Sequence, residues 1–185
     1  MFFLLFLLQF SCHQHIKYKR FVRKGFATVP AKELAGRLID DVMININKYG
    51  IRYWIYPISK EHQLGSPYGY RKHPVHSKTI FHRGQDIPCK KGTWIRAISD
   101  GVVITSRKSS SAGKYVEIKH NSSTHDVVSR YLHLHRRFIG KNAIVSAGQI
   151  IGTCGSSGTS TGNHLHFEII VNGKSVPPFI SFYRK

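Results

Sequence analysis

The chain has 185 residues, enough for one domain with a hydrophobic core, and this length leaves little room for a second globular unit. Its 28 Lys and Arg residues face only 9 Asp and Glu residues, and the net charge of +19 favours an acidic partner: nucleic acid, an anionic membrane or an anionic polymer. The three cysteines are too few and too widely spaced for a disulfide scaffold or a CxxC metal site. Cys89 and Cys154 are expected to be buried free thiols, with a bridge between them as the alternative in an oxidising compartment.

The first predicted element is the apolar run MFFLLFLLQF at residues 1–10. It is too short to span a bilayer comfortably and resembles the hydrophobic region of an export signal. The basic cluster KYKRFVRK that follows favours retention of that flank at the cytoplasmic face. Residues 1–15 are therefore predicted to be either a cleaved signal or an uncleaved anchor, and the position of Cys12 after the run leaves lipidation open.

An amphipathic helix is predicted over residues 29–47, within an N-terminal extension that covers residues 16–60. Pro30 is a helix-start signal, and Lys48-Tyr49-Gly50 is expected to end the helix. The apolar positions recur every four residues: Leu34, Leu38, Val42 and Ile46.

Residues 61–180 are predicted to form a mainly β domain, a compact antiparallel sheet or sandwich, and residues 181–185 a basic tail. Short β-rich runs bounded by Gly, Asp, Asn and Ser favour this fold class, because no helical period continues through the region. Asp100-Gly101 and Asn172-Gly173 tolerate positive φ and are expected to close tight hairpins. The expected strands are Trp94–Ile98, Gly101–Thr105, Tyr115–His120, Val127–Leu132, Gln149–Ile151 and His164–Val171.

Regularly spaced histidines indicate a metal site. His82 and Asp86 are four residues apart, and positions i and i+4 of an extended chain share a face. His164 and His166 alternate along a predicted strand, and His133-Leu134-His135 repeats that spacing. Zinc catalysis needs three nitrogen or oxygen ligands and an open position for water, which two histidines and one carboxylate provide. Since the sequence has no HExxH motif, a spare neutral histidine is expected to handle the proton.

An ordered series of motifs lies between residues 62 and 180. The motifs are SPYGYRKHP from Ser66, HRGQD from His82, DGVV from Asp100, YLHL from Tyr131, GQIIG from Gly148 and GSSGTSTGNHLHFE from Gly155. This series closely resembles the lysostaphin/LytM-like zinc endopeptidases. The resemblance implies a compact antiparallel β domain around a narrow groove, one bound zinc ion, and cleavage of peptide cross-links or stem peptides in bacterial peptidoglycan.

Carried over position by position, the resemblance implies a division of roles. It makes His82, Asp86 and His166 the zinc ligands, and it makes His133 and His164 the groups that act on the water and the oxyanion. Three residues depart from the usual pattern without removing a ligand, and they affect the expected groove shape: Gln85, Trp94 and Asn163. The remaining residues near the motifs are interpreted as surface or supporting residues (His73, His120 and His135), a residue that orders the preceding loop (Arg71) and a flexible rim (residues 155–163).

The sequence therefore predicts a zinc metalloendopeptidase of the cell envelope, acting on peptidoglycan at the periplasmic or extracellular face. Anionic envelope polymers or the membrane surface are further candidate partners for its basic charge. The alternative is a catalytically silent module of the same fold that binds the cell wall or activates another hydrolase. Binding to nucleic acid ranks lower, because only the charge favours it and the sequence contains no recognisable nucleic-acid motif.

Overall fold

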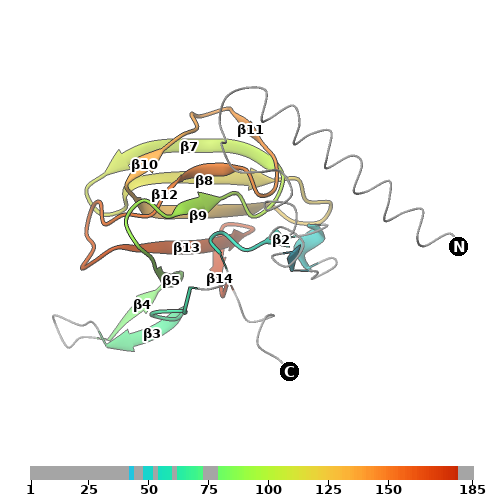
Figure 1. The fold of residues 1–185 in the computed structure, drawn as a ribbon. Helices are drawn as coiled ribbons and strands as arrows, with labels where there is room; N and C mark the ends of the chain where they lie inside the picture. The colour runs from blue at the N-terminus through green and yellow to red at the C-terminus, as the bar shows by residue number, and fades with distance from the viewer. Residues whose placement is uncertain (1–41, 44–47, 52–53, 60–61, 73–78, 179–185) are drawn as a thin grey trace, which may run out of the picture. The chain divides into compact units, whose positions relative to one another are not determined.

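The computed structural model describes residues 42–43, 48–51, 54–59, 62–72 and 79–178. The chain divides into two units, Met1–Asp40 and Asp41–Lys185, and every described residue belongs to the second. Strands dominate this part, as predicted, and a short 3-10 turn, η1, spans Lys48–Gly50 (Figure 1). Within the described residues, no helix is long and apolar enough to cross a membrane.

The largest sheet has seven strands in an antiparallel arrangement. Its order is β11-β7-β8-β9-β13-β14, and β5 pairs with the N-terminal half of β13 on the edge that β14 occupies further along. The strands are β5 (Gln85–Pro88), β7 (Gly101–Ser109), β8 (Gly113–His120), β9 (Val127–Leu134), β11 (Ile144–Val145), β13 (His164–Val171) and β14 (Lys174–Val176).

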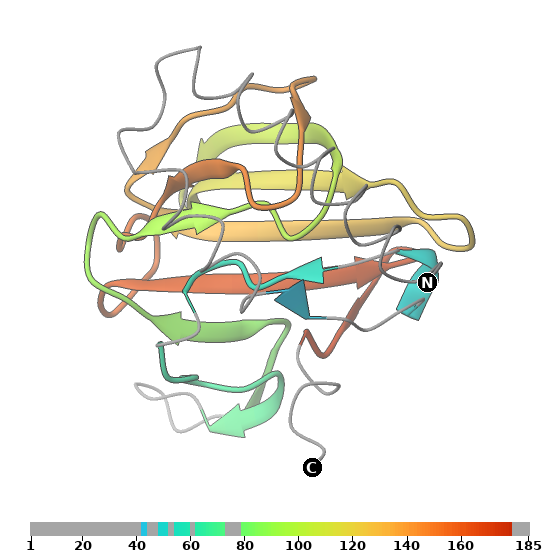
Figure 2. The same cartoon turned by 45° about the vertical axis from the view of Figure 1, so that its right-hand side comes forward.

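Three smaller sheets complete the described part. A three-stranded sheet has the order β10-β12-β6, and two hairpin-like pairs are β1-β2 and β3-β4. Figures 1 and 2 show the three-stranded sheet against one face of the large sheet. The strands are β1 (Val42–Met43), β2 (Trp54–Ile55), β3 (Gly69–Lys72), β4 (Thr79–His82), β6 (Trp94–Arg96), β10 (Arg136–Arg137) and β12 (Ile150–Thr153).

The hydrophobic core joins the two larger sheets. Ile95 of β6 and Ile151 of β12 belong to the same buried cluster as Tyr131 of β9 and Phe167 of β13. Because side chains alternate along a strand, Leu165 and Phe167 enter this core while the histidines of β13 project from the other face. Each buried side chain of this size contributes about 1.5–3 kcal/mol to the free energy of unfolding, so the core fixes the register that presents the histidines.

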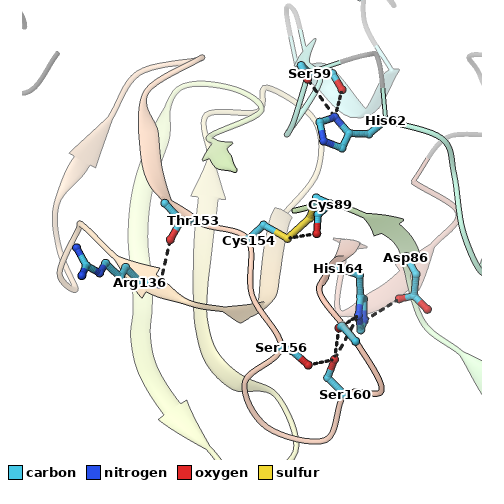
Figure 3. Close-up of a disulfide and its surroundings, with 11 residues drawn as sticks. Ser59, His62, Asp86, Cys89, Arg136, Thr153, Cys154, Ser156, Ser160 and His164 are labelled. Atoms are coloured by element: carbon cyan, nitrogen blue, oxygen red, sulfur yellow. Dashed lines mark hydrogen bonds and ion pairs between the residues drawn. A yellow bond between two sulfur atoms is a disulfide. The ribbon is translucent and has the colours of Figure 1, made fainter. Parts of the chain in front are cut away.

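Cys89 and Cys154 form a disulfide, with their Cα atoms 6.4 Å apart, so the expectation of free thiols is wrong (Figure 3). Spacing alone could not reveal the bridge, because the fold brings together residues that are 65 apart in the sequence. Cys89 directly follows β5 and Cys154 directly follows β12. The bridge therefore ties the strand that carries Asp86 to the start of the Gly/Ser segment, residues 155–163.

Two local predictions differ from the structure, and one is confirmed. The helix expected over residues 29–47 lies outside the described residues except at Val42–Met43, which pair as a strand with β2, so the prediction is wrong there. Asp100-Gly101 does not close a hairpin, because β6 and β7 belong to different sheets. Asn172-Gly173 does, with φ values of 49° and 77° between β13 and β14. The expected basic tail, residues 181–185, lies outside the described residues.

Candidate metal centre

Three strands bring His82, Asp86 and His166 together. His82 ends β4, Asp86 lies in β5, and the register of β5 on β13 places Asp86 directly opposite His166. The chain turns at Gly84, where an added Cβ would lie 2.5 Å from the Phe167 carbonyl oxygen and 2.8 Å from the His166 ring. His82 and Asp86 therefore meet through a turn against β13 that separates β4 from β5.

The three side chains present a triangle of ligand atoms. His82 Nε2 and His166 Nδ1 lie 3.2 Å and 2.8 Å from Asp86 Oδ1, and the two ring nitrogens are 3.0 Å apart. His82 Nδ1–H donates to the Pro67 carbonyl at 2.7 Å, and His166 Nε2–H donates to Glu168 Oε1 at 3.0 Å. The nitrogen of each ring that is left to bind a metal is therefore the one that faces Asp86.

Such a triangle suits a small cation. Bonds of about 2.0–2.2 Å in a tetrahedral zinc site place the ligand atoms roughly 3.3 Å apart, close to the spacing of these three atoms. Two imidazole nitrogens and one carboxylate oxygen are also the donors that catalytic zinc prefers. Within the described residues, these three form the cluster of His, Cys, Asp and Glu that could hold a metal ion.

The charges around the triangle favour a cation as well. Burial alone would raise the pKa of Asp86, but the His166 and His82 rings hold that pKa well below its usual range. Burial would likewise raise the pKa of Glu168, yet His166 and Arg130 lower it. Both carboxylates are therefore ionised at neutral pH.

Arg71 connects the site to the preceding loop. Arg71 Nη2 lies 3.7 Å from Asp86 Oδ2, and Nη1 of the same side chain donates to Ser66 in that loop.

His133 lies beside the triangle at the end of β9. Its ring centroid is 4.8 Å from that of His164 and 5.9 Å from that of His166. Nδ1–H donates to the Ser157 carbonyl at 2.8 Å, which leaves Nε2 as an acceptor. Burial lowers the pKa of His133 to about 4, with further lowering by His164 and His166, so the ring is neutral near pH 7.

His164 completes the group from the Gly/Ser segment side. Its Nδ1–H donates to the Gly162 carbonyl at 2.9 Å, and its Nε2 lies 3.7 Å from Asp86 Oδ1 (Figure 3). Ser160 also contacts the ring, with Oγ 3.3 Å from Nδ1. The structure thus brings all five predicted residues together.

The second pair of spaced histidines, His133 and His135, differs from the pair on β13. His133 has a φ of 61°, so the chain leaves regular strand geometry there, and His133 and His135 do not repeat the alternation of His164 and His166. The carbonyl of His135 accepts a hydrogen bond from Lys114. His73 lies outside the described residues. Glu168 is the contact that sequence reasoning missed, although it continues the alternation two residues after His166.

His120 is buried, so its interpretation as a surface residue is wrong. Nδ1–H donates to the Asp100 carbonyl at 3.0 Å, and Nε2 lies 2.7 Å from the Ser129 hydroxyl. Burial lowers the pKa of His120 to about 4, although Asp100 opposes the shift. The folded protein therefore holds this ring neutral.

We expect His120 to make stability depend on pH. Its pKa is lower in the folded chain than in the unfolded chain, so its contribution is complete above about pH 6.5 and is lost as pH falls toward 4. The loss is on the order of 3 kcal/mol of unfolding free energy. Urea denaturation of the wild type and His120→Gln at pH 7 and pH 4 measures it. Equal pH dependence in the two proteins would contradict the prediction.

Comparisons with known proteins find relatives of this chain. The model of peptidase family M23 matches residues 80–178. Peptidoglycan DD-endopeptidase ShyA of Vibrio cholerae serotype O1 is 38% identical over 122 residues, which are 65% of this chain and 28% of that protein. DD-carboxypeptidase/endopeptidase Mpg of Neisseria meningitidis serogroup B is 38% identical over 116 residues, 63% of this chain and 26% of that protein. The chain thus spans less than a third of the length of either relative.

Solved structures show the same fold. A zinc containing peptidase from Vibrio cholerae superposes with a TM-score of 0.59 at 39% identity, covering 66% of this chain and 37% of that one. The catalytic domain of lysostaphin from Staphylococcus simulans superposes with a TM-score of 0.57 at 30% identity, covering 64% of this chain and 90% of that one. The predicted resemblance is confirmed.

Proposed function

Because the chain belongs to peptidase family M23, we propose that it is a zinc endopeptidase that hydrolyses peptide cross-links or stem peptides of bacterial peptidoglycan. The observation that carries the proposal is the triangle of His82, Asp86 and His166 with two further histidines beside it. Relatives named as peptidoglycan DD-endopeptidases support the substrate class, and the structure of a zinc containing peptidase supports the metal.

The ligand atoms follow from the hydrogen bonds. His82 Nε2, His166 Nδ1 and Asp86 Oδ1 would hold the zinc, since the opposite nitrogen of each ring is committed to an acceptor. Zinc bound there supplies a Lewis acid for the scissile carbonyl and lowers the pKa of water toward about 7. The Pro67 carbonyl orients the His82 ring, Glu168 orients the His166 ring, and Arg71 lies beside the Asp86 carboxylate, all without a metal.

The two remaining histidines handle the proton. His133 is neutral near pH 7 and presents Nε2, so it accepts a proton from the attacking water and returns it to the leaving amine. His164 lies on the Asp86 side of His133, and because its Nδ1–H donates to the Gly162 carbonyl, its Nε2 is an acceptor that orients the attacking water. Each ring is oriented by a backbone carbonyl, that of Ser157 or that of Gly162.

The proposed substrate supports an activity in the cell envelope, on the periplasmic or extracellular side. Residues 1–15, the expected signal or anchor, lie outside the described residues. The net charge of +19 suits the anionic polymers and membrane surfaces found there.

The test is digestion of purified peptidoglycan sacculi by the zinc-loaded full chain. Mass spectrometry of the released muropeptides is expected to show fragments in which one peptide bond has gained the elements of water. A chelator is expected to stop their release, and added zinc to restore it. Stoichiometric zinc with no new fragment would instead favour the silent cell-wall-binding module.

A further inference from the structure

A row of three charged residues crosses the large sheet next to the metal centre. Strand register places Glu117 of β8 opposite Arg130 of β9, and Arg130 opposite Glu168 of β13. Arg130 Nε donates to Glu117 Oε1 at 2.7 Å, and Arg130 Nη1 donates to Glu168 Oε2 at 2.8 Å. One guanidinium therefore joins two carboxylates in a fixed order.

Glu168 uses its two oxygens for different partners. Oε2 binds Arg130, whereas Oε1 accepts the hydrogen bond from His166 Nε2 at 3.0 Å. The side chain is only 6% exposed, so water competes little for either contact. Arg130 thus holds the carboxylate that faces the back of the His166 ring.

This contact decides which His166 nitrogen can bind a metal. Glu168 and Asp86 both accept hydrogen bonds and do not donate them, so the metal-free ring can donate to either carboxylate. Once a metal takes Nδ1, the one remaining ring proton must lie on Nε2, facing Glu168. His166 Nδ1 is the atom that lies 2.8 Å from Asp86 Oδ1 and 3.0 Å from His82 Nε2. The opposite tautomer would turn an N–H toward the other two ligand atoms.

We infer that Glu168, anchored by Arg130, is a positioning residue that fixes the orientation and tautomer of His166 and thereby sets the zinc affinity of the site. The inference rests on the proposed zinc site and extends it beyond the three ligands. Carboxylates that hold a metal-binding histidine in this way typically change metal affinity about 10–100-fold when they are replaced.

Glu117 provides a matched control. It binds the same Arg130 at nearly the same distance, but it is two strands away from β13 and its hydrogen bond ends at the guanidinium. A purely structural role for the row would make the two carboxylates equivalent. A positioning role makes only Glu168 matter for zinc.

The experiment compares Glu168→Gln with Glu117→Gln in the full chain, by competition for zinc with a chromophoric chelator. Glu168→Gln is expected to bind zinc about 10–100-fold more weakly than the wild type, and Glu117→Gln within roughly 2-fold of it. Thermal unfolding of the metal-free proteins reports any shared loss of stability separately. Wild-type affinity in Glu168→Gln, or an equal loss in both variants, would overturn the inference.

A second measurement needs no substitution. Imidazole nitrogen NMR of the zinc-loaded wild type is expected to show the His166 proton on Nε2, with Nδ1 bound to the metal. A proton on Nδ1 would overturn the inference even if both variants failed to fold. A wild type that binds no zinc would overturn the proposed zinc site together with it, whereas zinc binding that is unaffected by Glu168→Gln overturns the inference alone.

Discussion

Asp86→Ala is expected to abolish both zinc binding and hydrolysis. Asp86 Oδ1 lies within 3.2 Å of both ring nitrogens, and Asp86 is the only negatively charged residue of the three proposed ligands. Without it, two imidazoles remain, fewer than the three protein ligands of a catalytic zinc site. Zinc analysis of the purified variant should fall from about one ion per chain to background. Release of muropeptides from sacculi should stop as well.

Asp126→Ala is the control for that experiment. Asp126 is an exposed carboxylate that pairs with Lys119 at 2.8 Å, and such a surface pair contributes about 0–1 kcal/mol. This variant is expected to keep its zinc and its turnover. If Asp86→Ala kept the metal, the ligand assignment would be wrong. If it lost the metal but kept full turnover, the proposed zinc mechanism would be wrong.

Long alternating strands were the predictable part of the fold. The prediction of His164–Val171 matches β13 residue for residue, because polar and apolar side chains alternate over its first six positions and β-branched residues continue it. Strands of two to four residues, such as β5 and β10, carry too little periodicity to be recognised. Their pairing depends on β13 and β12, which are distant in sequence, so they become visible only in the folded chain.

Pairs close in sequence were predictable in the site, and distant contacts were not. The spacing of His82 and Asp86 predicted that they meet, although the turn at Gly84 that brings them together depends on β13. The Cys89–Cys154 bridge has no local signal at all. Glu168 had a local sequence signal, because it continues the alternation of His164 and His166. Its role could not be predicted from that signal, because the side chain is held by Arg130 from another strand.

His133→Asn is expected to keep zinc and lose turnover. His133 lies outside the ligand triangle, and its proposed task is to carry a proton on Nε2, which an amide cannot do. Loss of a general acid–base typically lowers the rate about 10²–10⁴-fold. Asn is chosen because His133 has a φ of 61°, a conformation that Asn adopts with less strain than Ala. Rate measurements on a soluble cross-linked muropeptide should show the loss in kcat, with KM changed much less.

His135→Asn is the matched control, two residues along the chain. Its backbone carbonyl, rather than its ring, makes the contact with Lys114, so the substitution is expected to leave both zinc and kcat unchanged. The pair of variants separates three roles for His133. Retained zinc with a low kcat supports the proton carrier, and loss of zinc would make His133 part of the metal site. Unchanged kcat would remove it from the mechanism and leave the proton to His164, whose Nε2 lies 3.7 Å from Asp86.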